Sequence, residues 1–125
     1  MLRKILAVDD SALIHQMYKL FLSRYKNCKL VSAMNGLEAL DKLGQEEGID
    51  LILLDINMPV MNGAELLRAI ADDERWSRLT RVIISTDGST ARREEAAGLD
   101  VRCYLEKPFS PEVLRDVLND VAEAV

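Results

Sequence analysis

The sequence is poor in the residues that build disulfide scaffolds, zinc sites and nucleic-acid-binding surfaces. It has two cysteines, Cys28 and Cys103, and a single histidine among 125 residues. The cysteines lack the close Cys/His spacing of a zinc site, so we expect free thiols in a reducing compartment. A net charge of -5 and a pI of about 4.9 argue against nucleic-acid contact, which needs a clustered basic surface.

Long hydrophobic runs are also missing. Only the short apolar run 5–8 precedes Asp9, which is too little for a signal peptide or a membrane span. We therefore expect a cytoplasmic protein without membrane contact. The sequence shows no internal repeat, low-complexity tract or linker, and its length suits one domain over residues 1–125. Whether an effector domain follows in a longer chain is left open.

What the sequence does contain is a regular alternation of strand and helix patterns. Branched apolar runs at 5–8, 51–54 and 82–84 predict buried parallel strands, and weaker runs at 29–33 and 101–105 predict two more. Helical patterns lie between and after them, at 11–24, 36–43, 63–71, 90–97 and 111–124. Such alternation predicts an α/β fold: a doubly wound, flavodoxin-like (βα)5 domain with a five-stranded parallel sheet.

Carboxylates fall where two of these strands end. Asp9 and Asp10 follow the first strand, and Asp55 closes the third. In open α/β sheets, functional groups collect at the carboxyl edge of the strands. Carboxylates this close persist mainly around a cation or a shared proton, and oxygen-only ligands suit Mg²⁺. The alternative for Asp9 and Asp10 is a helix cap beside an acidic turn residue.

The segment after Asp55 predicts a sharp turn. Pro59 fixes one backbone angle, and Gly63 permits a backbone conformation closed to other residues. The turn would place the backbone carbonyl of Asn57 where it can bind the same metal. A carboxylate such as Asp55 can attack phosphorus and form an acyl phosphate.

Two more residues supply groups that this chemistry needs. Lys107 follows the fifth strand, and its ammonium could pair with Asp55 and later with phosphoryl oxygen. Thr86, at the end of the fourth strand, offers a hydroxyl for the phosphoryl group. The alternatives are an ordinary surface lysine and a strand-end β-branched residue.

Together these residues resemble the receiver domain of two-component response regulators, in its single-domain chemotaxis form. The resemblance spans the whole chain. Four motifs carry it, in the family's order: the pair Asp9-Asp10, the run Asp-x-x-Met-Pro-x-x-x-Gly at 55–63, a hydroxyl residue after 82–84, and Lys-Pro-Phe at 107–109. The resemblance implies the strand order 2-1-3-4-5.

The resemblance also implies roles for individual residues. Asp55 would be the phosphoacceptor, and Mg²⁺ would be held by Asp10, Asp55 and the Asn57 backbone carbonyl, with Asp9 acting through water. Thr86 and Lys107 would sense the phosphoryl group. Tyr104 would be the switch residue that turns inward when the threonine moves, or else a half-buried strand tyrosine. The Lys107-Pro108 peptide bond would be cis.

As a receiver, the protein would act with partners rather than as an enzyme on other substrates. A histidine kinase or histidine phosphotransfer protein would donate the phosphoryl group, and hydrolysis of the acyl phosphate would reset the switch. The signal would leave through the face formed by the fourth helix, fifth strand and fifth helix. The cognate kinase, the downstream target, the phosphorylated lifetime and the oligomeric state are left open.

The sequence departs from the family pattern at three places. Ser85 precedes Thr86, so either can occupy the hydroxyl position, and Thr86 is our preferred assignment. Asp87 stands where a small residue is usual and could slow phosphotransfer or shift metal binding. Gly98 precedes Lys107 by nine positions, two more than in the commoner pattern Gly-Ala-x-x-Tyr-x-x-Lys, and the fourth helix is short.

Other distinctive residues favour structural roles. We expect His15 to lie away from the acidic cluster, as a surface or packing residue. Trp76 is expected to anchor the connection before the fourth strand, and the charged run 92–95 to form a solvated helix face.

Three other functions compete with the receiver. An aspartate-dependent phosphatase would need an acid two residues after Asp55, where Asn57 stands. A nucleotide or flavin binder would need a glycine-rich loop after the first strand, which is missing. A pseudo-receiver, which is never phosphorylated and acts as an interaction module, is the main alternative, although the acid, hydroxyl and lysine set is intact.

Overall fold

The computed structural model describes residues 2–25 and 27–124. It contains five parallel strands, β1 (Lys4–Val8), β2 (Lys29–Ala33), β3 (Leu51–Leu54), β4 (Thr80–Ser85) and β5 (Cys103–Glu106). They form one sheet in the order β2-β1-β3-β4-β5. The predicted α/β fold and strand order are therefore confirmed.

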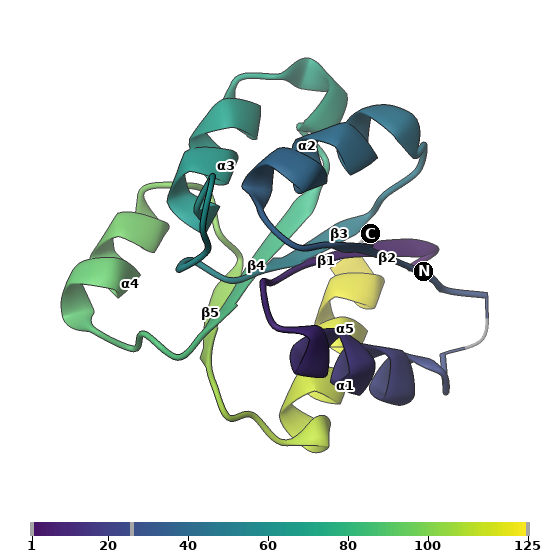
Figure 1. Cartoon of the computed structure of the whole chain (residues 1–125). Coiled ribbons are helices and arrows are strands. Elements are labelled where there is room, and N and C mark those ends of the chain that lie inside the picture. Colours follow the sequence, from purple (N-terminus) through teal and green to yellow (C-terminus); the bar gives the residue numbers. More distant parts are fainter. Residues whose placement is uncertain (1, 26, 125) are drawn as a thin grey trace.

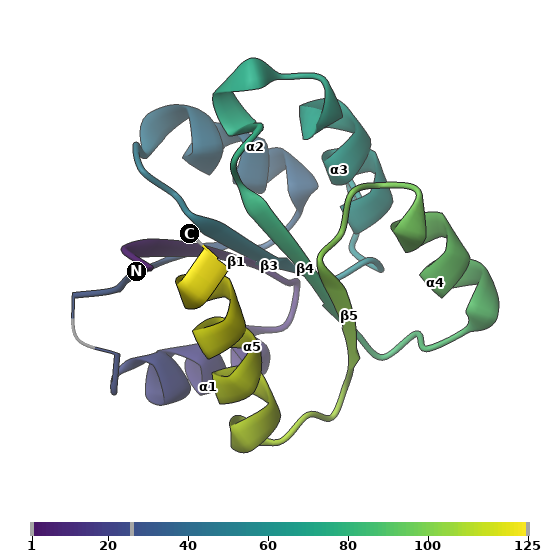
Figure 2. The same ribbon diagram turned by 180° about the vertical axis from the view of Figure 1, so that it is seen from behind.

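Helices cover both faces of this sheet. They are α1 (Ala12–Leu22), α2 (Gly36–Gln45), α3 (Gly63–Ala71), α4 (Thr90–Ala97) and α5 (Pro111–Ala124), with a short 3₁₀ helix η1 (Glu74–Trp76) before β4. Helices α1 and α5 lie on one face, and α2 and α3 lie on the other with α4 beside β5 (Figures 1 and 2). Of the helices in the described ranges, none combines the length and the apolarity that a membrane crossing requires.

The sheet separates two hydrophobic cores, which explains why its central strand, β3, contains only apolar residues. All four residues of β3 are buried. Leu51 and Leu53 face α1 and α5, whereas Ile52 and Leu54 face α2 and α3. Because successive side chains point to opposite faces, a strand covered on both sides must be apolar throughout.

The helix boundaries follow the expected capping chemistry. Ser11 caps α1 by accepting a hydrogen bond from the Ile14 amide, and Ser110 does the same for the Val113 amide at the start of α5. The fifth strand starts later than predicted, at Cys103. Asp100, in the connection before it, has a φ of 57°, a conformation that aspartate tolerates.

Candidate functional site

The three predicted carboxylates meet at the carboxyl edge of the sheet. Because β1 and β3 are neighbours paired with Val8 opposite Leu54, Asp9 and Asp55 leave the sheet side by side. Asp9, Asp10 and Asp55 each place a carboxylate oxygen within 4.8 Å of the others. Asp9 and Asp55 are buried and Asp10 is exposed, so the cluster opens to solvent on one side.

Lys107 lies between the two buried carboxylates. Its Nζ is 2.5 Å from Asp9 Oδ2 and 3.3 Å from Asp55 Oδ2. The Lys107 amide donates to the Ser85 carbonyl oxygen at 2.8 Å, and the Lys107-Pro108 peptide is cis, as the resemblance implied. Buried charges are stable when they are paired, and here one ammonium serves two carboxylates. The alternative of an ordinary surface lysine does not describe this residue.

The turn after Asp55 is as sharp as predicted, but for a different reason. Gly63 does not adopt a positive φ; the residue that does is Val60, with a φ of 68°. A Cβ on Gly63 would lie 2.3 Å from the Asp55 carbonyl oxygen, so glycine is needed for close approach of two backbones. The Asn57 amide donates to Asp55 Oδ1 at 3.3 Å, which orients the carboxylate.

Two adjacent hydroxyl residues, Ser85 and Thr86, stand at the end of β4 and differ in burial. The Ser85 side chain is fully buried, and its Oγ accepts a hydrogen bond from the Asp87 amide at 3.2 Å. Thr86 is exposed. Ser85 continues the face that carries Ile83 and Leu54, whereas Asp55 and Thr86 follow on the opposite alternation. The assignment of the phosphoryl-sensing hydroxyl to Thr86 stays a prediction.

Tyr104 lies next to Ser85 on the same face of the sheet. Its hydroxyl donates to the Asp87 carbonyl oxygen, and its ring is half-buried against the core under α3. Burial raises the pKa of Tyr104 above its usual value, while a hydrogen bond with the Ser85 side chain opposes the rise. The phenol is therefore a neutral donor at physiological pH.

Asp87 is held by hydrogen bonds on its own loop. Its Oδ1 accepts from the Ser89 amide at 3.1 Å, and its Oδ2 lies 3.4 Å from Arg92 Nε. The hydrogen bonds from Ser89 are the main reason that the pKa of Asp87 falls below its usual value, with the charge of Arg92 adding to the effect. Asp87 is not part of the carboxylate cluster found within the described residues.

The charged run 92–95 is more than the solvated helix face expected from its sequence. Arg92 Nη2 lies 3.5 Å from the side-chain oxygen of Asn57, which joins α4 to the turn after Asp55. The Arg93 guanidinium stacks over the Tyr104 ring at 4.7 Å. Both arginines therefore connect α4 to the residues around the cluster.

His15 was expected to lie away from the cluster, and this is wrong. Its side chain is buried, and Nε2 donates to the Asp9 carbonyl oxygen at 2.8 Å, while Nδ1 has no hydrogen-bond partner in the described part of the chain. Tyr18 also lies near the cluster: burial raises its pKa, and the charges of Asp9 and Asp55 raise it further. One turn of helix separates the two residues, a spacing that placed both on the buried side of α1.

The donor set fits a hard divalent cation. The carboxylates of Asp9, Asp10 and Asp55 supply only oxygen, and they form the one group of three or more ionisable ligands found in residues 2–25 and 27–124. Mg²⁺ prefers one or two carboxylates with water and phosphate oxygens completing its shell. His15 is not a member of this group.

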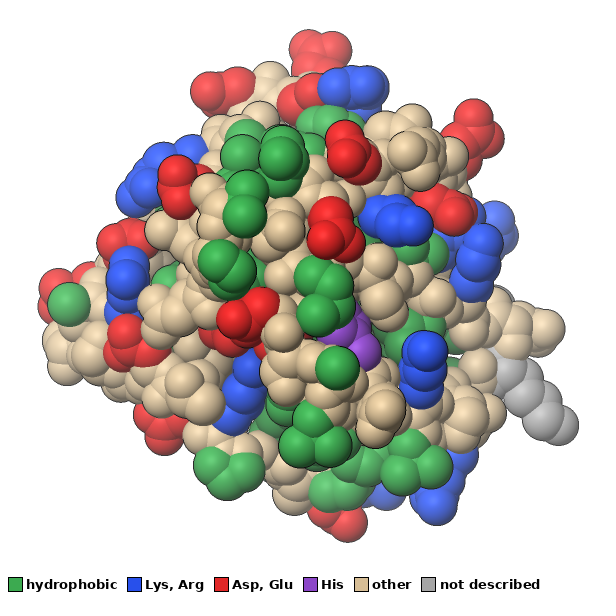
Figure 3. Space-filling model, in the orientation of Figure 1, with side chains coloured by type: hydrophobic (Ala, Val, Ile, Leu, Met, Phe, Trp, Pro, Cys, Tyr) green, Lys and Arg blue, Asp and Glu red, His purple; other side chains and the backbone are tan. Residues whose placement is uncertain are grey.

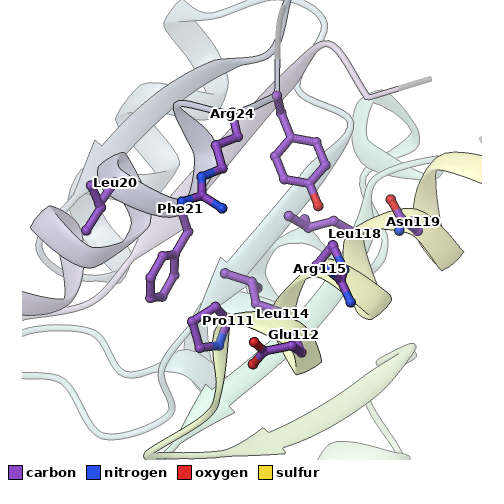
Figure 4. A pocket seen from close by; sticks show the side chains of 10 residues that line it. Leu20, Phe21, Arg24, Pro111, Glu112, Leu114, Arg115, Leu118 and Asn119 are labelled. Carbon is purple, nitrogen blue, oxygen red and sulfur yellow. The ribbon is translucent and has the colours of Figure 1, made fainter.

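A groove lies elsewhere in the molecule. Helices α1 and α5 border a groove of about 660 Å³, with Phe21, Leu114 and Leu118 among its lining residues (Figure 4). None of the clustered carboxylates lines it. The groove is connected to the site through two aromatic rings. Phe21 meets Phe109, two residues beyond Lys107, edge to face, with the ring centroids 6.4 Å apart.

The profile of one family, described as the response regulator receiver domain, matches residues 5–119. The chain belongs to this family. The receiver domain is 34% identical over 118 residues to a chemotaxis protein CheY homolog of Campylobacter jejuni, covering 94% of this chain and 91% of the relative. It is 35% identical over 118 residues to the chemotaxis protein CheY1 of Helicobacter pylori, covering 94% and 95%.

Solved structures agree with this assignment. The chemotaxis protein CheY4 of Vibrio cholerae superposes on the receiver domain with a TM-score of 0.87 at 33% identity, covering 97% of this chain and 99% of that one. This receiver domain is therefore similar to single-domain chemotaxis receivers, as its motifs indicated.

Proposed function

We propose that residues 1–125 form one receiver domain that acts in the cytoplasm as a magnesium-dependent switch, with Asp55 as its phosphoacceptor. The observation that carries the proposal is the position of Lys107, whose ammonium lies 2.5 Å from Asp9 and 3.3 Å from Asp55. This arrangement pairs the Asp55 carboxylate with a cation and orients it at the edge of the sheet. It also provides a cation that can follow negative charge from the carboxylate to a phosphoryl group.

The reaction is a transfer between two acceptors. An oxygen of Asp55 attacks the phosphorus of a phosphohistidine on a histidine kinase or histidine phosphotransfer protein. The new O–P bond forms as the P–N bond breaks, and its electron pair stays on the donor imidazole. Water later attacks the acyl phosphate, releases inorganic phosphate and restores the carboxylate. The protein changes only its own state, so it is not an enzyme acting on other substrates.

The cation would be held by the carboxylates of Asp10 and Asp55 and the backbone carbonyl of Asn57, with Asp9 contributing through water. When bound, Mg²⁺ supplies positive charge against the phosphoryl oxygens. Lys107 would exchange its contact with Asp55 for a phosphoryl oxygen and keep its contact with Asp9. That retained contact would fix where the ammonium sits during transfer.

The output would start at Thr86. Its exposed hydroxyl would donate to the phosphoryl group, and this would move the backbone that leads into Asp87. Because Tyr104 donates to the carbonyl oxygen of Asp87, the loop before α4 and the tyrosine would shift together. Phosphorylation would thus change the populations of two arrangements of the α4, β5 and α5 face, which meets an unidentified downstream protein.

A surface suited to the phosphodonor surrounds the cluster. Four large apolar side chains are exposed on loops and helix starts at the carboxyl edge of the sheet, namely Leu13, Met34, Leu37 and Val60. In Figure 3 hydrophobic side chains are interspersed with carboxylates on the face shown. Exposed apolar side chains rimmed by polar ones are typical of protein contacts, which supports docking of a donor protein here.

Intact mass spectrometry tests the proposal directly. The protein is incubated with acetyl phosphate, with Mg²⁺ or with a chelator, as the wild type and as Asp55→Asn. We expect one phosphoryl group to be added to the wild type only when Mg²⁺ is present, and none to the variant. A folded wild type that gains no mass would instead support the pseudo-receiver, and a variant that still gains mass would place the acceptor elsewhere.

A further inference from the structure

A second polar hollow lies at the opposite edge of the sheet. The α3–β4 connection and the α4–β5 connection meet there, at the amino ends of the parallel strands (Figures 1 and 2). They border a hollow of about 290 Å³ whose charged lining residues are Arg78, Arg81, Arg102 and Asp100. Three arginines face one acid, in a chain whose net charge is -5. This edge of the sheet is therefore locally positive, although the net charge of the chain is negative.

Arg81 is the central residue of the hollow. Its side chain is 5% exposed, and its guanidinium donates to the carbonyl oxygens of Leu79 at 3.0 Å and Trp76 at 3.2 Å. Neutral carbonyls satisfy N–H groups but do not neutralise the charge. Buried charges in proteins are normally paired with an opposite charge or a bound ion, so Arg81 requires an anion close by.

Asp100 is the acidic residue that the chain places near Arg81, and it is a weak partner for a buried charge. Asp100 Oδ2 lies 3.7 Å from Arg81 Nη1, and the Asp100 side chain is 93% exposed. A pair with one partner in solvent is screened and contributes little. Arg81 is thus a buried cation whose only ion pair within the described residues is a weak one.

The two remaining arginines leave donors available at the rim. Arg78 is exposed and makes no ion pair or side-chain hydrogen bond within residues 2–25 and 27–124. Arg102 pairs with Asp120 of α5 at 2.8 Å, and its amide donates to the Arg81 carbonyl oxygen at 2.8 Å. This backbone hydrogen bond holds Arg81 and Arg102 on adjacent segments of the chain, and both residues line the hollow.

We propose that this hollow binds a phosphate dianion, either inorganic phosphate or the phosphate group of a small metabolite. Planar guanidinium groups match phosphate oxygens through paired N–H donors, and two or three of them around one space favour a doubly charged anion over a single carboxylate. The longer α4–β5 connection supplies Asp100 and Arg102, so the departure from the family pattern builds part of the site. The site is separate from Asp55 and carries no chemistry.

The single tryptophan provides the measurement. Its carbonyl oxygen accepts a hydrogen bond from Arg81, so an anion bound by Arg81 changes the surroundings of Trp76. The full chain is titrated with inorganic phosphate, AMP and glycerol phosphate without Mg²⁺, at constant ionic strength set with sodium chloride, and fluorescence is recorded. Saturation by all three supports a site for the shared phosphate group. Tighter binding of one ester identifies a metabolite as the better occupant.

Two substitutions are expected to change the dissociation constant for phosphate in opposite directions. Arg78→Gln removes a donor, and we expect the dissociation constant for phosphate to rise by about tenfold or more. Asp100→Asn removes a competing carboxylate while it keeps a residue that tolerates positive φ, and we expect the dissociation constant to fall by about threefold or more. Arg115→Gln on α5 is the matched control, since it removes the same charge outside the hollow. Amide shifts of Ser77 and Arg102 in NMR spectra provide a second readout.

Three results would overturn the site. One is a fluorescence signal that fails to saturate with any of the three anions up to about 10 mM, the weak end of specific affinities. Another is an equal loss of affinity in Arg78→Gln and Arg115→Gln, which would mean general screening by net charge. The third is a larger dissociation constant for phosphate in Asp100→Asn than in the wild type. Arg78→Gln should still accept a phosphoryl group at Asp55 at the wild-type rate, because the two sites lie at opposite edges.

Discussion

Single side chains at the ends of strands decide what the carboxyl edge can do. Ser85 and Thr86 are adjacent hydroxyl residues, yet one is fully buried beside Tyr104 and the other is exposed. The difference follows from the alternation of strand side chains, because Ser85 continues the face to which Ile83 belongs. The buried hydroxyl accepts a hydrogen bond from the Asp87 amide, and the exposed one is accessible at the carboxyl edge.

We expect Thr86→Ala to slow phosphorylation by acetyl phosphate by about 10- to 100-fold, the effect of losing a hydrogen bond to a charged group. Ser85→Ala removes a hydroxyl on the other face and should change the rate by less than about twofold. The rates are measured by intact mass against time at fixed Mg²⁺. Equal effects of the two changes would contradict the assignment of the hydroxyl to Thr86.

Glycines offer another matched pair. A Cβ on Gly63 would meet the Asp55 carbonyl oxygen at 2.3 Å, whereas a Cβ on Gly44 would have no atom within 4 Å. Gly63→Ala should therefore destabilise the protein by about 1–3 kcal/mol, as overpacking does. Gly44→Ala, in the exposed part of α2, should stabilise it by about 0.5–1 kcal/mol. Urea unfolding of both variants checks the signs, and a neutral Gly63→Ala would mean that the turn can move away.

At the level of elements, α1 serves the site in two ways. Its buried side holds His15 against the Asp9 carbonyl and places Tyr18 next to Phe109, at a ring separation of 6.1 Å. Its outer side exposes Leu13 at 65% and Leu20 at 68%. These two leucines are two turns apart, so they share a face but lie at different distances from the carboxyl edge.

Because the two leucines lie at different distances from the carboxyl edge, docking of a donor protein can be tested separately from the phosphorylation reaction. We expect Leu13→Glu to slow transfer from a phosphohistidine protein by about tenfold or more, because a charge is placed in an apolar contact, while the rate with acetyl phosphate stays unchanged. Leu20→Glu is the control, with the same change farther from the edge. Phosphotransfer is followed with a radiolabelled donor. If Leu13→Glu slowed both donors alike, the residue would be acting on the site itself rather than on docking.

For the whole molecule, the buried Tyr18 of α1 makes the free energy of unfolding depend on pH in the alkaline range. The ordinary pKa of tyrosine is 10.0, and burial together with the charges of Asp9 and Asp55 raises that of Tyr18. The folded protein therefore keeps a proton that the unfolded chain releases. The stabilisation from Tyr18 is complete below about pH 10 and is lost as the pH rises from there through the folded pKa, at up to about 1.4 kcal/mol per pH unit.

We expect Tyr18→Phe to reduce the loss of stability between pH 10 and 11 relative to wild type, since it keeps the ring and removes the ionisable hydroxyl. Tyr25→Phe is the control, because burial raises the pKa of Tyr25 but the nearby Arg115 opposes the rise. Urea unfolding at each pH gives the two slopes. A slope unchanged in Tyr18→Phe would assign the alkaline loss to other groups.

The sequence predicted the fold and the carboxylate cluster because both depend on periodicity and strand order. Apolar runs locate the strands, and parallel pairing then brings the acids that follow β1 and β3 to one edge. The position of Ser85, the buried contact of His15 and the close approach at Gly63 were not predicted. Each depends on the direction of one side chain or on a distance between backbones, which a linear pattern of residue types does not contain.

The two edges of the sheet also carry natural spectroscopic reporters. The only histidine donates to the Asp9 carbonyl at one edge, and the only tryptophan accepts from Arg81 at the other. The ring ¹⁵N resonances of His15 would follow events at the carboxylates while Trp76 emission follows the arginines. Communication across the sheet, or its absence, can therefore be measured in the wild-type sequence after ¹⁵N enrichment, without a substitution or an attached probe.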